Sequence, residues 1–495
     1  MIIEGAYPYV AGGVSAWVHD LISAQSHLSF HLVVLTADDA PRRLQYVLPE
    51  NVRGITGIAL QKRERRIPTA DAARALLDDL EQPLRALLDR GGRDDFAEVL
   101  SVLRSHRQTA NSAALLNSEA AFEMLQRMYE TSVPGGSFLN YFWSWRSLVG
   151  GLFSVLLARL PRAGVYHAIS TGYAGLVMAR AVLQTGRPGI LTEHGIYTSE
   201  RRIEIAMADW MVDQTRGTLD IDRRRRDLRD VWLDAFVGYS RTCYECASRI
   251  IALYKDNQVL QRRDGAPPDR QAVVPNGVDV DLYASVPRDP GPRRPTVALI
   301  GRVVPIKDVK TYIRAAALLR ELVPEVRVLM LGPTDEDPAY FRECQEMVVY
   351  LGLAGCFEFT GRVRLLEYLG QIDAIALTSL SEAQPLVLLE AGAAGVPSVA
   401  TNVGSCRDII EGRDDEDPPL GPGGFVTPLG NPRATAQALA QLLLDPALRA
   451  RCGEAIQRRA RRYYSKPLAD ATYRRLYELH LAKPDRSRRA MEVVN

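Results

Sequence analysis

Short apolar runs alternate with helical patterns along most of this chain, and that alternation restricts its fold more than any other feature. Strands that alternate with helices are typical of parallel sheets that carry helices on both faces. The strand-like runs are residues 31–36, 164–169, 189–192 and 235–239 in the first half and 296–300, 327–331, 356–360, 373–380 and 398–400 in the second. We therefore predict an α/β fold of doubly wound parallel sheets.

Length and composition predict more than one domain. A chain of 495 residues is too long for a single hydrophobic core. Residues 286–295 are dense in Pro and Gly, which is typical of a linker. We predict a first Rossmann-like domain over residues 1–290, a second over 291–462, and a C-terminal helix and tail over 463–495. Residues 61–145 interrupt the alternation with charged, Ala- and Leu-rich sequence, and we expect a helical insertion there that docks a partner.

Two carboxylates and a helix start follow the run 373–380. Glu382 comes directly after the expected strand, and Glu390 lies about one and a half turns into an expected helix over Pro385–Ala394. Pro suits the first turn of a helix, and the free N–H groups of that turn attract phosphate. Those groups belong to Leu386, Val387 and Leu388. The segment indicates an anion site, although acidic residues near a helix start also occur as simple partners of the helix dipole.

Two cations follow the run 296–300. Gly301, Arg302 and Lys307 occupy the expected turn after this strand. Arginine offers a planar fork to phosphate oxygens and lysine a compact point charge, so the two together can hold a diphosphate. The alternative is a pair of solvated surface cations, since the chain has 61 Lys plus Arg.

The first half offers two further candidates. Gly12 and Gly13 open an expected helix, where backbone without side chains can approach a ligand, although a tight turn explains two glycines equally well. His194 follows the run 189–192 among polar neighbours that include Glu193 and Arg201. A lone histidine is more often structural, but a polar strand end favours a functional one.

These segments together carry a resemblance to a known family. They are Glu382-x7-Glu390, Gly301-Arg302 with Lys307, residues 275–279, Gly361-Arg362 and Val403-Gly404. They resemble the retaining glycosyltransferases of family 4, which have the GT-B fold. Residues 4–20, 193–202 and 332–337 resemble more narrowly the PelF-type transferases of Pel exopolysaccharide synthesis. The resemblance covers most of the chain apart from residues 61–145.

The resemblance implies an activity and a fold. The fold would be two Rossmann-like domains that face each other across a ligand-binding crevice. The reaction would move a hexose from a UDP-sugar to a growing exopolysaccharide with retention at the anomeric carbon. UDP-glucose is the first choice of donor, with UDP-GalNAc or UDP-GlcNAc behind it. Family members need no metal, so the resemblance implies no cofactor and no metal site.

The resemblance also implies roles for particular residues. Arg302 and Lys307 would hold the diphosphate, Glu390 the ribose hydroxyls, and Glu382 the sugar. The implied catalytic residues are His194, Glu382, Arg302 and Lys307, and the implied binding residues also include Gly12, Gly13, Ala383, Gln384, Leu386, Val387, Glu390, Gly361 and Arg362.

Two departures from the family pattern leave the donor sugar open. Ala383-Gln384 stands where many members carry Gly-Phe, and Ser405-Cys406 replaces a more usual Gly. Two other functions also remain open. One is a sugar-nucleotide epimerase of the same shape, and the other is a nucleotide-binding scaffold that recruits a membrane synthase.

Composition bears on partners and compartment. The net charge of +2, with acidic and basic residues mixed, gives no electrostatic footprint for a nucleic acid. The basic run Arg223–Arg226 fits a solvated helix face better than a contact with anionic lipid or polymer. Six irregularly placed cysteines fit a reducing compartment, and Cys243-x2-Cys246 lacks the second pair of a zinc site.

We expect a cytoplasmic protein that reaches the inner membrane through Pel synthase components. No signal peptide is visible, and the apolar stretch 148–158 is far shorter than the ~20 residues of a spanning helix. Only Met1–Ile3 precede the Glu4-Gly5 turn, although a strand of such a sheet normally has about five residues. We expect the encoding DNA to continue upstream with apolar codons; a stop codon directly before Met1 would contradict this.

Overall fold

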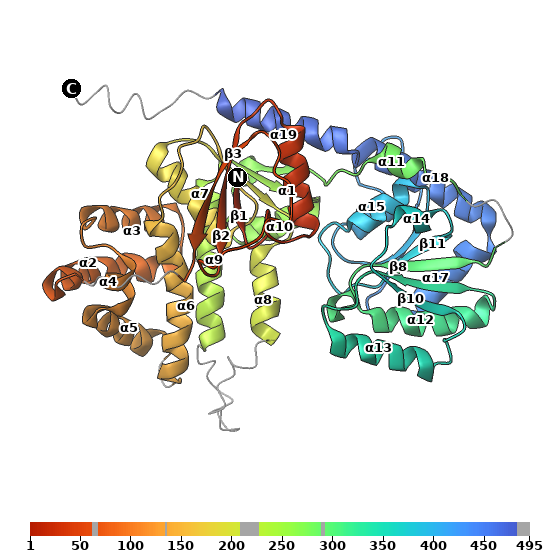
Figure 1. Ribbon diagram of the computed structural model, residues 1–495, viewed down its shortest axis with the longest axis horizontal. Helices are drawn as coiled ribbons and strands as arrows, with labels where there is room; N and C mark the ends of the chain where they lie inside the picture. The colour runs from red at the N-terminus through yellow and green to blue at the C-terminus, as the bar shows by residue number, and fades with distance from the viewer. Residues whose placement is uncertain (62–67, 134–135, 208–226, 289–292, 483–495) are drawn as a thin grey trace. The chain divides into compact units, whose positions relative to one another are not determined.

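The computed structural model of the protein describes residues 1–61, 68–133, 136–207, 227–288 and 293–482. The basic run Arg223–Arg226 lies outside these described residues. Contacts between residues divide the chain into two units (Figure 1). The first unit is Met1–Val273 together with the chain from Tyr473 onward, and the second is Val274–Thr472.

The division between the units lies at Val273, earlier than the boundary that we predicted at residue 290. The residues that follow it pack into the second unit. Val278 is 5% exposed there, and the short helix α11 (Val280–Ala284) packs against α15 (Leu386–Ala393). The position of the boundary therefore depends on which core buries Val278. The density of Pro and Gly in residues 286–295 gives no information about that burial.

The described residues of the first unit carry a seven-stranded parallel sheet in the order β3-β2-β1-β4-β5-β6-β7. The order reverses between β1 and β4, which is the switch point of a doubly wound sheet. The strands are β1 (Ile2–Glu4), β2 (Phe30–Thr36), β3 (Val52–Ala59), β4 (Tyr166–Ala168), β5 (Gly189–Glu193), β6 (Arg249–Ala252) and β7 (Gln271–Val273). Its crossover helices are α1 (Gly13–Ala24), α7 (Gly172–Thr185), α8 (Tyr197–Met207), α9 (Leu228–Cys246) and α10 (Lys255–Arg263).

The described residues of the second unit carry a six-stranded parallel sheet in the order β10-β9-β8-β11-β12-β13. Its strands are β8 (Thr296–Ile300), β9 (Arg327–Leu331), β10 (Phe357–Gly361), β11 (Ala374–Leu377), β12 (Ser398–Thr401) and β13 (Gly424–Thr427). Its longer helices are α12 (Val309–Leu322), α13 (Pro338–Tyr350), α17 (Pro432–Leu444) and α18 (Pro446–Tyr463), and α14 (Leu366–Leu369) and α16 (Cys406–Ile410) are single turns.

Both faces of the second sheet are buried. Along β9, Val328 and Met330 enter one apolar core, whereas Leu329 and Leu331 enter another. Successive side chains of a strand point to opposite faces, so helices must cover both sides of the sheet. The predicted class, doubly wound parallel α/β, is confirmed.

One predicted strand is wrong. Residues 235–239 lie inside helix α9, where Ala235 and Tyr239 are fully buried and Phe236 is 3% exposed. An apolar run that is buried on all sides lacks the alternation that separates a strand from a helix. The helix packs so tightly that a Cβ on Gly91 would lie 2.2 Å from the carbonyl oxygen of Gly238.

Four strands were not predicted. β3, β7 and β13 lie at sheet edges and are partly exposed, so their sequences lack a continuous apolar run. β6 is interior but has only four residues. Half-exposed strands give weak sequence signals because little of their surface is buried, and a run of four residues is too short to show a clear pattern.

Five helices occupy the described part of the chain between β3 and β4, where we predicted an insertion over residues 61–145. They are α2 (Ala70–Asp89), α3 (Arg93–Ser105), α4 (Ser112–Asn117), α5 (Glu119–Ser132) and α6 (Phe138–Leu157). The helical segment extends to Leu157, beyond the predicted end at residue 145. Helix α6 continues that far because its later residues, such as Leu152 and Phe153, are buried in the core of the first unit together with Tyr141 and Trp145.

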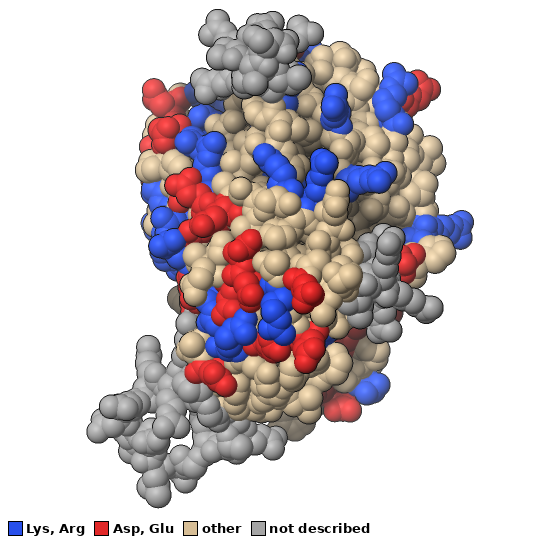
Figure 2. All heavy atoms as spheres, turned by 90° about the vertical axis from the view of Figure 1, so that its left-hand side faces the viewer, with Lys and Arg blue, Asp and Glu red and all other residues tan. Residues whose placement is uncertain are grey.

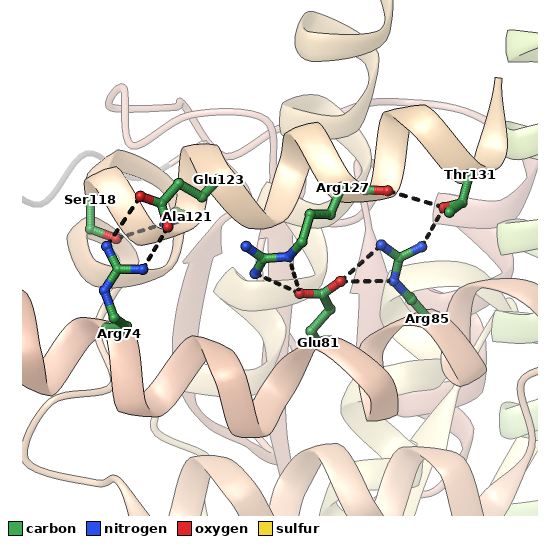
Figure 3. Close-up of polar contacts among 8 residues, drawn as sticks. All are labelled: Arg74, Glu81, Arg85, Ser118, Ala121, Glu123, Arg127 and Thr131. Atoms are coloured by element: carbon green, nitrogen blue, oxygen red, sulfur yellow. Dashed lines mark hydrogen bonds and ion pairs between the residues drawn. The ribbon is translucent and has the colours of Figure 1, made fainter. Parts of the chain in front are cut away.

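Ion pairs join α2 to α5 (Figure 3). Arg74 pairs with Glu123 at 2.6 Å, and Glu81 accepts from both Arg85, at 2.8 Å, and Arg127, at 2.6 Å. Arg127 belongs to α5, whereas Arg85 lies on α2 with Glu81 and donates to Thr131 Oγ1 of α5, at 2.5 Å. Because Glu81 is largely buried, these contacts fix the position of α5 along α2.

Acidic and basic side chains lie side by side in the lower half of Figure 2, which views the side of the protein that carries α2–α5. Charges of both signs therefore meet on this face.

Within the part of the chain that the structure describes, no helix is both long and apolar enough to cross a membrane.

Candidate functional site

The neighbouring strands β8 and β11 form the switch point of the second sheet, because the chain continues from them toward opposite edges. In doubly wound sheets, ligands bind beyond the carboxyl ends of the strands at such a point. The chain leaves β8 at Gly301 and β11 at Thr378. Residues 301–307 and 378–384 therefore lie at the edge of the sheet where a ligand site is expected.

The two strand-end segments are hydrogen bonded to each other. Thr378 Oγ1 donates to the carbonyl oxygens of Lys307, at 3.1 Å, and Asp308, at 3.0 Å. The N–H of Leu380 donates to the carbonyl oxygen of Ile306 at 2.9 Å. Asp308 adopts a left-handed backbone, with φ of 44°, and its side chain caps α12. Asp tolerates this conformation better than most residues, so the turn that carries Lys307 is fixed against β11.

Lys307 and Glu382 form an ion pair at this edge. The distance from Lys307 Nζ to Glu382 Oε1 is 2.5 Å, and the two side chains are 19% and 13% exposed. Ser379 Oγ donates to the same carboxylate oxygen at 2.6 Å. The structure thus brings together one of the two predicted cations and the first predicted carboxylate, with a serine that the sequence did not single out.

The loop after β12 closes against the backbone of Glu382 and Ala383. A Cβ on Gly404 would lie 2.3 Å from the carbonyl oxygens of both residues, and the φ of Gly404 is +53°. The N–H of Ser405 donates to the carbonyl oxygen of Ala383 at 2.9 Å. Only glycine fits at position 404, because both the space and the backbone angle exclude a side chain.

Gln384 connects the same segment to residues 275–279. Its Oε1 accepts from the N–H of Asn276 at 2.6 Å. Gln384 Nε2 and Asn276 Oδ1 are buried, and neither has a hydrogen-bond partner among the described residues. Gln384, which with Ala383 stands where many family-4 enzymes carry Gly-Phe, therefore places a polar side chain with an unused donor beside Glu382.

Glu390 lies in α15 and has a partner from α11. Burial raises the pKa of the Glu390 carboxyl, and a hydrogen bond with Tyr283 partly offsets this effect. Burial and the Glu390 charge raise the pKa of Tyr283 in turn. One side of the Glu390 carboxyl is thus held by a phenol from a neighbouring helix.

Arg302 is not part of the cluster around Lys307. Its guanidinium pairs with Glu336 at 2.5 Å, and the two side chains are 53% and 48% exposed. Gly361 ends β10, and its carbonyl oxygen accepts from the N–H of Gly332 at 3.0 Å. Arg362 is exposed, and no described residue bonds to it. The structure therefore leaves these two arginines apart from Glu382.

The start of α15 differs from the expectation in one respect. Pro385 is the N-cap, and the N–H of Leu388 donates to its carbonyl oxygen at 3.1 Å, so that N–H is not free. The first turn closes tightly, as helix starts often do. The N–H groups of Leu386 and Val387 have no acceptor among the described residues, as is usual for the first turn of a helix.

In the first unit, Gly12 and Gly13 begin α1. Gly12 is the N-cap with an extended backbone, φ 172°, and a Cβ on either glycine would meet no atom within 4 Å. Both residues are exposed. Neither backbone strain nor packing therefore requires glycine at these two positions.

His194 follows β5 and contacts Trp17 of α1. The two rings meet edge to face, with centroids 4.4 Å apart. Burial lowers the pKa of His194 to about 4, so the imidazole is neutral near pH 7. Its Nε2 is buried without a hydrogen-bond partner in the described part of the chain. The side chain thus has one unused hydrogen-bonding atom and carries no positive charge.

His167, the middle residue of β4, is held from both sides. Its Nδ1 lies 2.7 Å from the hydroxyl of Tyr477 in α19 (Lys466–Leu481), and its Nε2 lies 2.8 Å from Thr192 Oγ1. Burial lowers its pKa to about 3. Both ring nitrogens are occupied, so this histidine has a structural role.

Glu193 is a fully buried carboxylate beside His194. It accepts from the hydroxyl of Tyr244 at 2.7 Å, from Gln261 Nε2 at 2.9 Å and from Thr171 Oγ1 at 3.2 Å. Burial raises its pKa to about 7, although these hydrogen bonds favour the charged form. Glu193 belongs to the core network that supports the end of β5.

The cysteines are free. Cys243 and Cys246 are buried in α9, where burial raises the pKa of both thiols. No group of three or more His, Cys, Asp or Glu side chains that could hold a metal ion is found among the described residues.

Three partners of site residues escaped the sequence reasoning: Ser379, Tyr283 and Trp17. Ser379 stands at the polar end of the run 373–380, which was the one available signal. Tyr283 meets Glu390, and Trp17 meets His194, only through tertiary packing between elements that are distant in the sequence.

Comparisons with known families divide the chain in two. Residues 1–269 match the family described as Domain of unknown function (DUF3492), and residues 288–459 match the family described as Glycosyl transferases group 1. The chain therefore carries a group 1 glycosyltransferase domain in its second unit.

Curated relatives match part of the chain. The D-inositol 3-phosphate glycosyltransferase of Kineococcus radiotolerans is 32% identical over 47% of this chain and 58% of that protein. The protein of that name from Thermobispora bispora is 27% identical over 68% of this chain and 80% of its own length. The chain spans 51% to 58% of the length of the first three curated relatives that it matches.

Solved structures show the fold. Sucrose-phosphate synthase from Thermosynechococcus elongatus aligns with a TM-score of 0.59 at 16% identity, covering 97% of this chain and 98% of that chain. Anabaena HepE in complex with UDP and glucose aligns with a TM-score of 0.57 at 15% identity, covering 96% and 99%. The predicted GT-B class is confirmed, with two Rossmann-like parallel sheets.

Proposed function

We infer that the chain, which belongs to the family described as Domain of unknown function (DUF3492), transfers a hexose from a UDP-sugar to a growing exopolysaccharide. The inference starts from the group 1 glycosyltransferase domain that the chain carries. The observation that supports this most is the Lys307–Glu382 ion pair at the carboxyl ends of β8 and β11. A cation and a carboxylate at a switch point suit a ligand that carries both phosphate and hydroxyl groups.

The proposal assigns the phosphates to positive groups. Lys307 contacts the diphosphate, Arg302 reaches it by leaving the exposed pair with Glu336, and the free N–H groups of Leu386 and Val387 complete the site. Negative charge grows on the diphosphate as its bond to the anomeric carbon breaks. Groups that hold this charge more strongly in the transition state than in the bound substrate accelerate the reaction.

The proposal assigns the hydroxyls to acceptors. Glu390 receives the ribose hydroxyls, and Glu382 with the backbone of Ala383 and Gln384 receives the hexose hydroxyls. Both carboxylates are already fixed by a donor on one side, Tyr283 for Glu390 and Ser379 for Glu382. In this proposal Gly361 and Arg362 border the donor, and no metal ion is required because cationic side chains and a helix N-terminus supply the positive charge.

The proposal also gives roles to residues of the first unit. A neutral His194 is suited to a sugar hydroxyl, since it can accept or donate one hydrogen bond without attracting phosphate. Gly12 and Gly13 are not demanded by the fold, so a close approach of ligand to backbone is a reason for them. In the finer form of the proposal, the enzyme is PelF-type, works with retention, and serves Pel synthase components at the inner membrane.

A donor panel tests the proposal. We expect calorimetry to show binding of UDP-glucose, UDP-GlcNAc or UDP-GalNAc, and loss of at least tenfold in affinity for Lys307→Ala. Lys310→Ala is the matched control, since Lys310 lies in α12 and pairs with Glu343 at 2.5 Å on the exposed surface. Equal affinity for ADP-glucose would contradict the donor class.

Product analysis separates the alternatives. A transferase liberates UDP only when an acceptor is present, whereas an epimerase changes the sugar without an acceptor. If Lys307→Ala and Glu382→Ala both leave polymer output intact while the protein still assembles with its partners, the scaffold function replaces the enzymatic one.

A further inference from the structure

We propose that Ser379 is a positioning residue for Glu382, holding one carboxylate oxygen so that the other is presented to the hexose of the donor. This inference rests on the proposed function, because it assumes that Glu382 contacts the sugar. It concerns a residue that neither the charge pattern nor the spacing of the two glutamates identifies.

The hydrogen bonds of Glu382 are asymmetric. Oε1 receives both Lys307 Nζ, at 2.5 Å, and Ser379 Oγ, at 2.6 Å. No residue that the structure describes donates to Oε2. The side chain is only 13% exposed, so few water molecules can replace a missing donor. The carboxylate is therefore oriented by two donors on one oxygen and keeps the other oxygen for a ligand.

The two donors differ in rigidity. Ser379 is 1% exposed, and its carbonyl oxygen accepts from Thr401 Oγ1 at 2.7 Å, which fixes the end of β11 to β12. Its hydroxyl is separated from this backbone by a single carbon. Lys307 reaches Oε1 through a flexible four-carbon stem. Ser379 is accordingly the fixed donor, and Lys307 is the donor that can move.

This difference matters when the donor substrate binds. A diphosphate attracts Lys307, which then shares its charge between phosphate and Glu382. Ser379 stays in place and keeps the orientation of the carboxylate. Supporting hydrogen bonds of this kind decide whether a group that contacts the ligand lies in the productive geometry.

The test compares UDP with a UDP-hexose. We expect Ser379→Ala to weaken binding of the UDP-hexose that the donor panel selects by about tenfold and to lower kcat/KM by about tenfold to a hundredfold, since a hydrogen bond to a charged group is lost. Affinity for UDP alone should stay within about twofold, because UDP lacks the hexose that Glu382 contacts. An equal loss for UDP and the UDP-hexose would reveal a general structural defect and overturn the proposal.

A double-variant comparison excludes an indirect effect. In the Glu382→Ala background, Ser379→Ala should cause no further loss of UDP-hexose affinity, because the group that it positions is gone. Additive losses would contradict the proposal. Ser398→Ala is the matched control: Ser398 is also fully buried, begins β12, and its Oγ has no partner among the described residues.

The two proposals fail differently. If the wild-type protein binds neither UDP nor any UDP-hexose, the proposed function is wrong. If it binds the UDP-hexose more tightly than UDP but Ser379→Ala binds both as the wild type does, only the role of Ser379 is wrong. Thermal unfolding of each variant checks that the second unit remains folded.

Discussion

Lys307 and Glu382 are 75 positions apart in the chain, and their side chains form a largely buried ion pair at the ends of two neighbouring parallel strands. The cation is supplied by the turn after β8 and the carboxylate by the segment after β11. Two consequences follow. Neither charge is well solvated. Among the described residues, each is the opposite charge that lies closest to the other.

Removing the second partner should therefore cost less than removing the first. We expect Lys307→Ala and Glu382→Ala each to lower the free energy of unfolding by about 1–3 kcal/mol, because the remaining charge is left partly buried and unpaired. The double variant should lie closer to the wild type than the sum of the two losses. Thermal or urea unfolding measures this, and strictly additive losses would show that the pair has no coupling energy.

Arg302 should behave differently, because its pair with Glu336 is about half exposed on both sides. Arg302→Ala should change stability by less than about 0.5 kcal/mol. If Arg302 contacts the diphosphate, the same variant weakens UDP binding at least fivefold, measured by calorimetry. Arg327→Ala is the control, since Arg327 also holds a partly exposed pair, with Glu358 at 2.8 Å. Equal UDP affinity in both variants would remove Arg302 from the site.

Gly404 closes the segment that carries Glu382, and substitution there should be severe. Gly404→Ala places a Cβ 2.3 Å from two carbonyl oxygens at a φ of +53°, so we expect a loss of at least about 3 kcal/mol in stability and loss of UDP-hexose binding. Gly430→Ala separates the two causes, because Gly430 has a φ of +60° and nothing within 4 Å of its Cβ position. It should cost about 1 kcal/mol. Similar losses in both variants would mean that backbone strain alone is responsible.

Glu193 should make stability fall as the pH rises. Burial raises its pKa from 4.5 to about 7, so between these values the folded state binds a proton that the unfolded state releases. The stabilising contribution of Glu193 is therefore fully present below about pH 4.5 and is lost as the pH rises through about 7. Glu193→Gln removes this titration, and its stability relative to the wild type should increase by up to about 3 kcal/mol between pH 4.5 and pH 8. A pH-independent difference between the two proteins in urea unfolding would contradict this.

The fold of the second unit could be predicted closely from the sequence. The runs 296–300 and 327–331 coincide with β8 and β9, because the central residues of these strands are buried on both faces of the sheet. The same signal failed at residues 235–239. That run lies where α9 packs against α2 and α7 and is also apolar, and a short apolar run cannot distinguish a helix from a strand.

The chemical groups at the strand ends could be predicted from local sequence: a turn with Arg302 and Lys307 follows one run, and a carboxylate with a helix start follows another. This was possible because strand ends, turns and helix starts depend on neighbouring residues. The folded chain was needed to show that Lys307 pairs with Glu382 while Arg302 pairs with Glu336. It was also needed to show that Ser379 and Lys307 donate to the same oxygen, Glu382 Oε1. Those pairings depend on β11 lying beside β8, and strand order arises from the packing of the whole sheet.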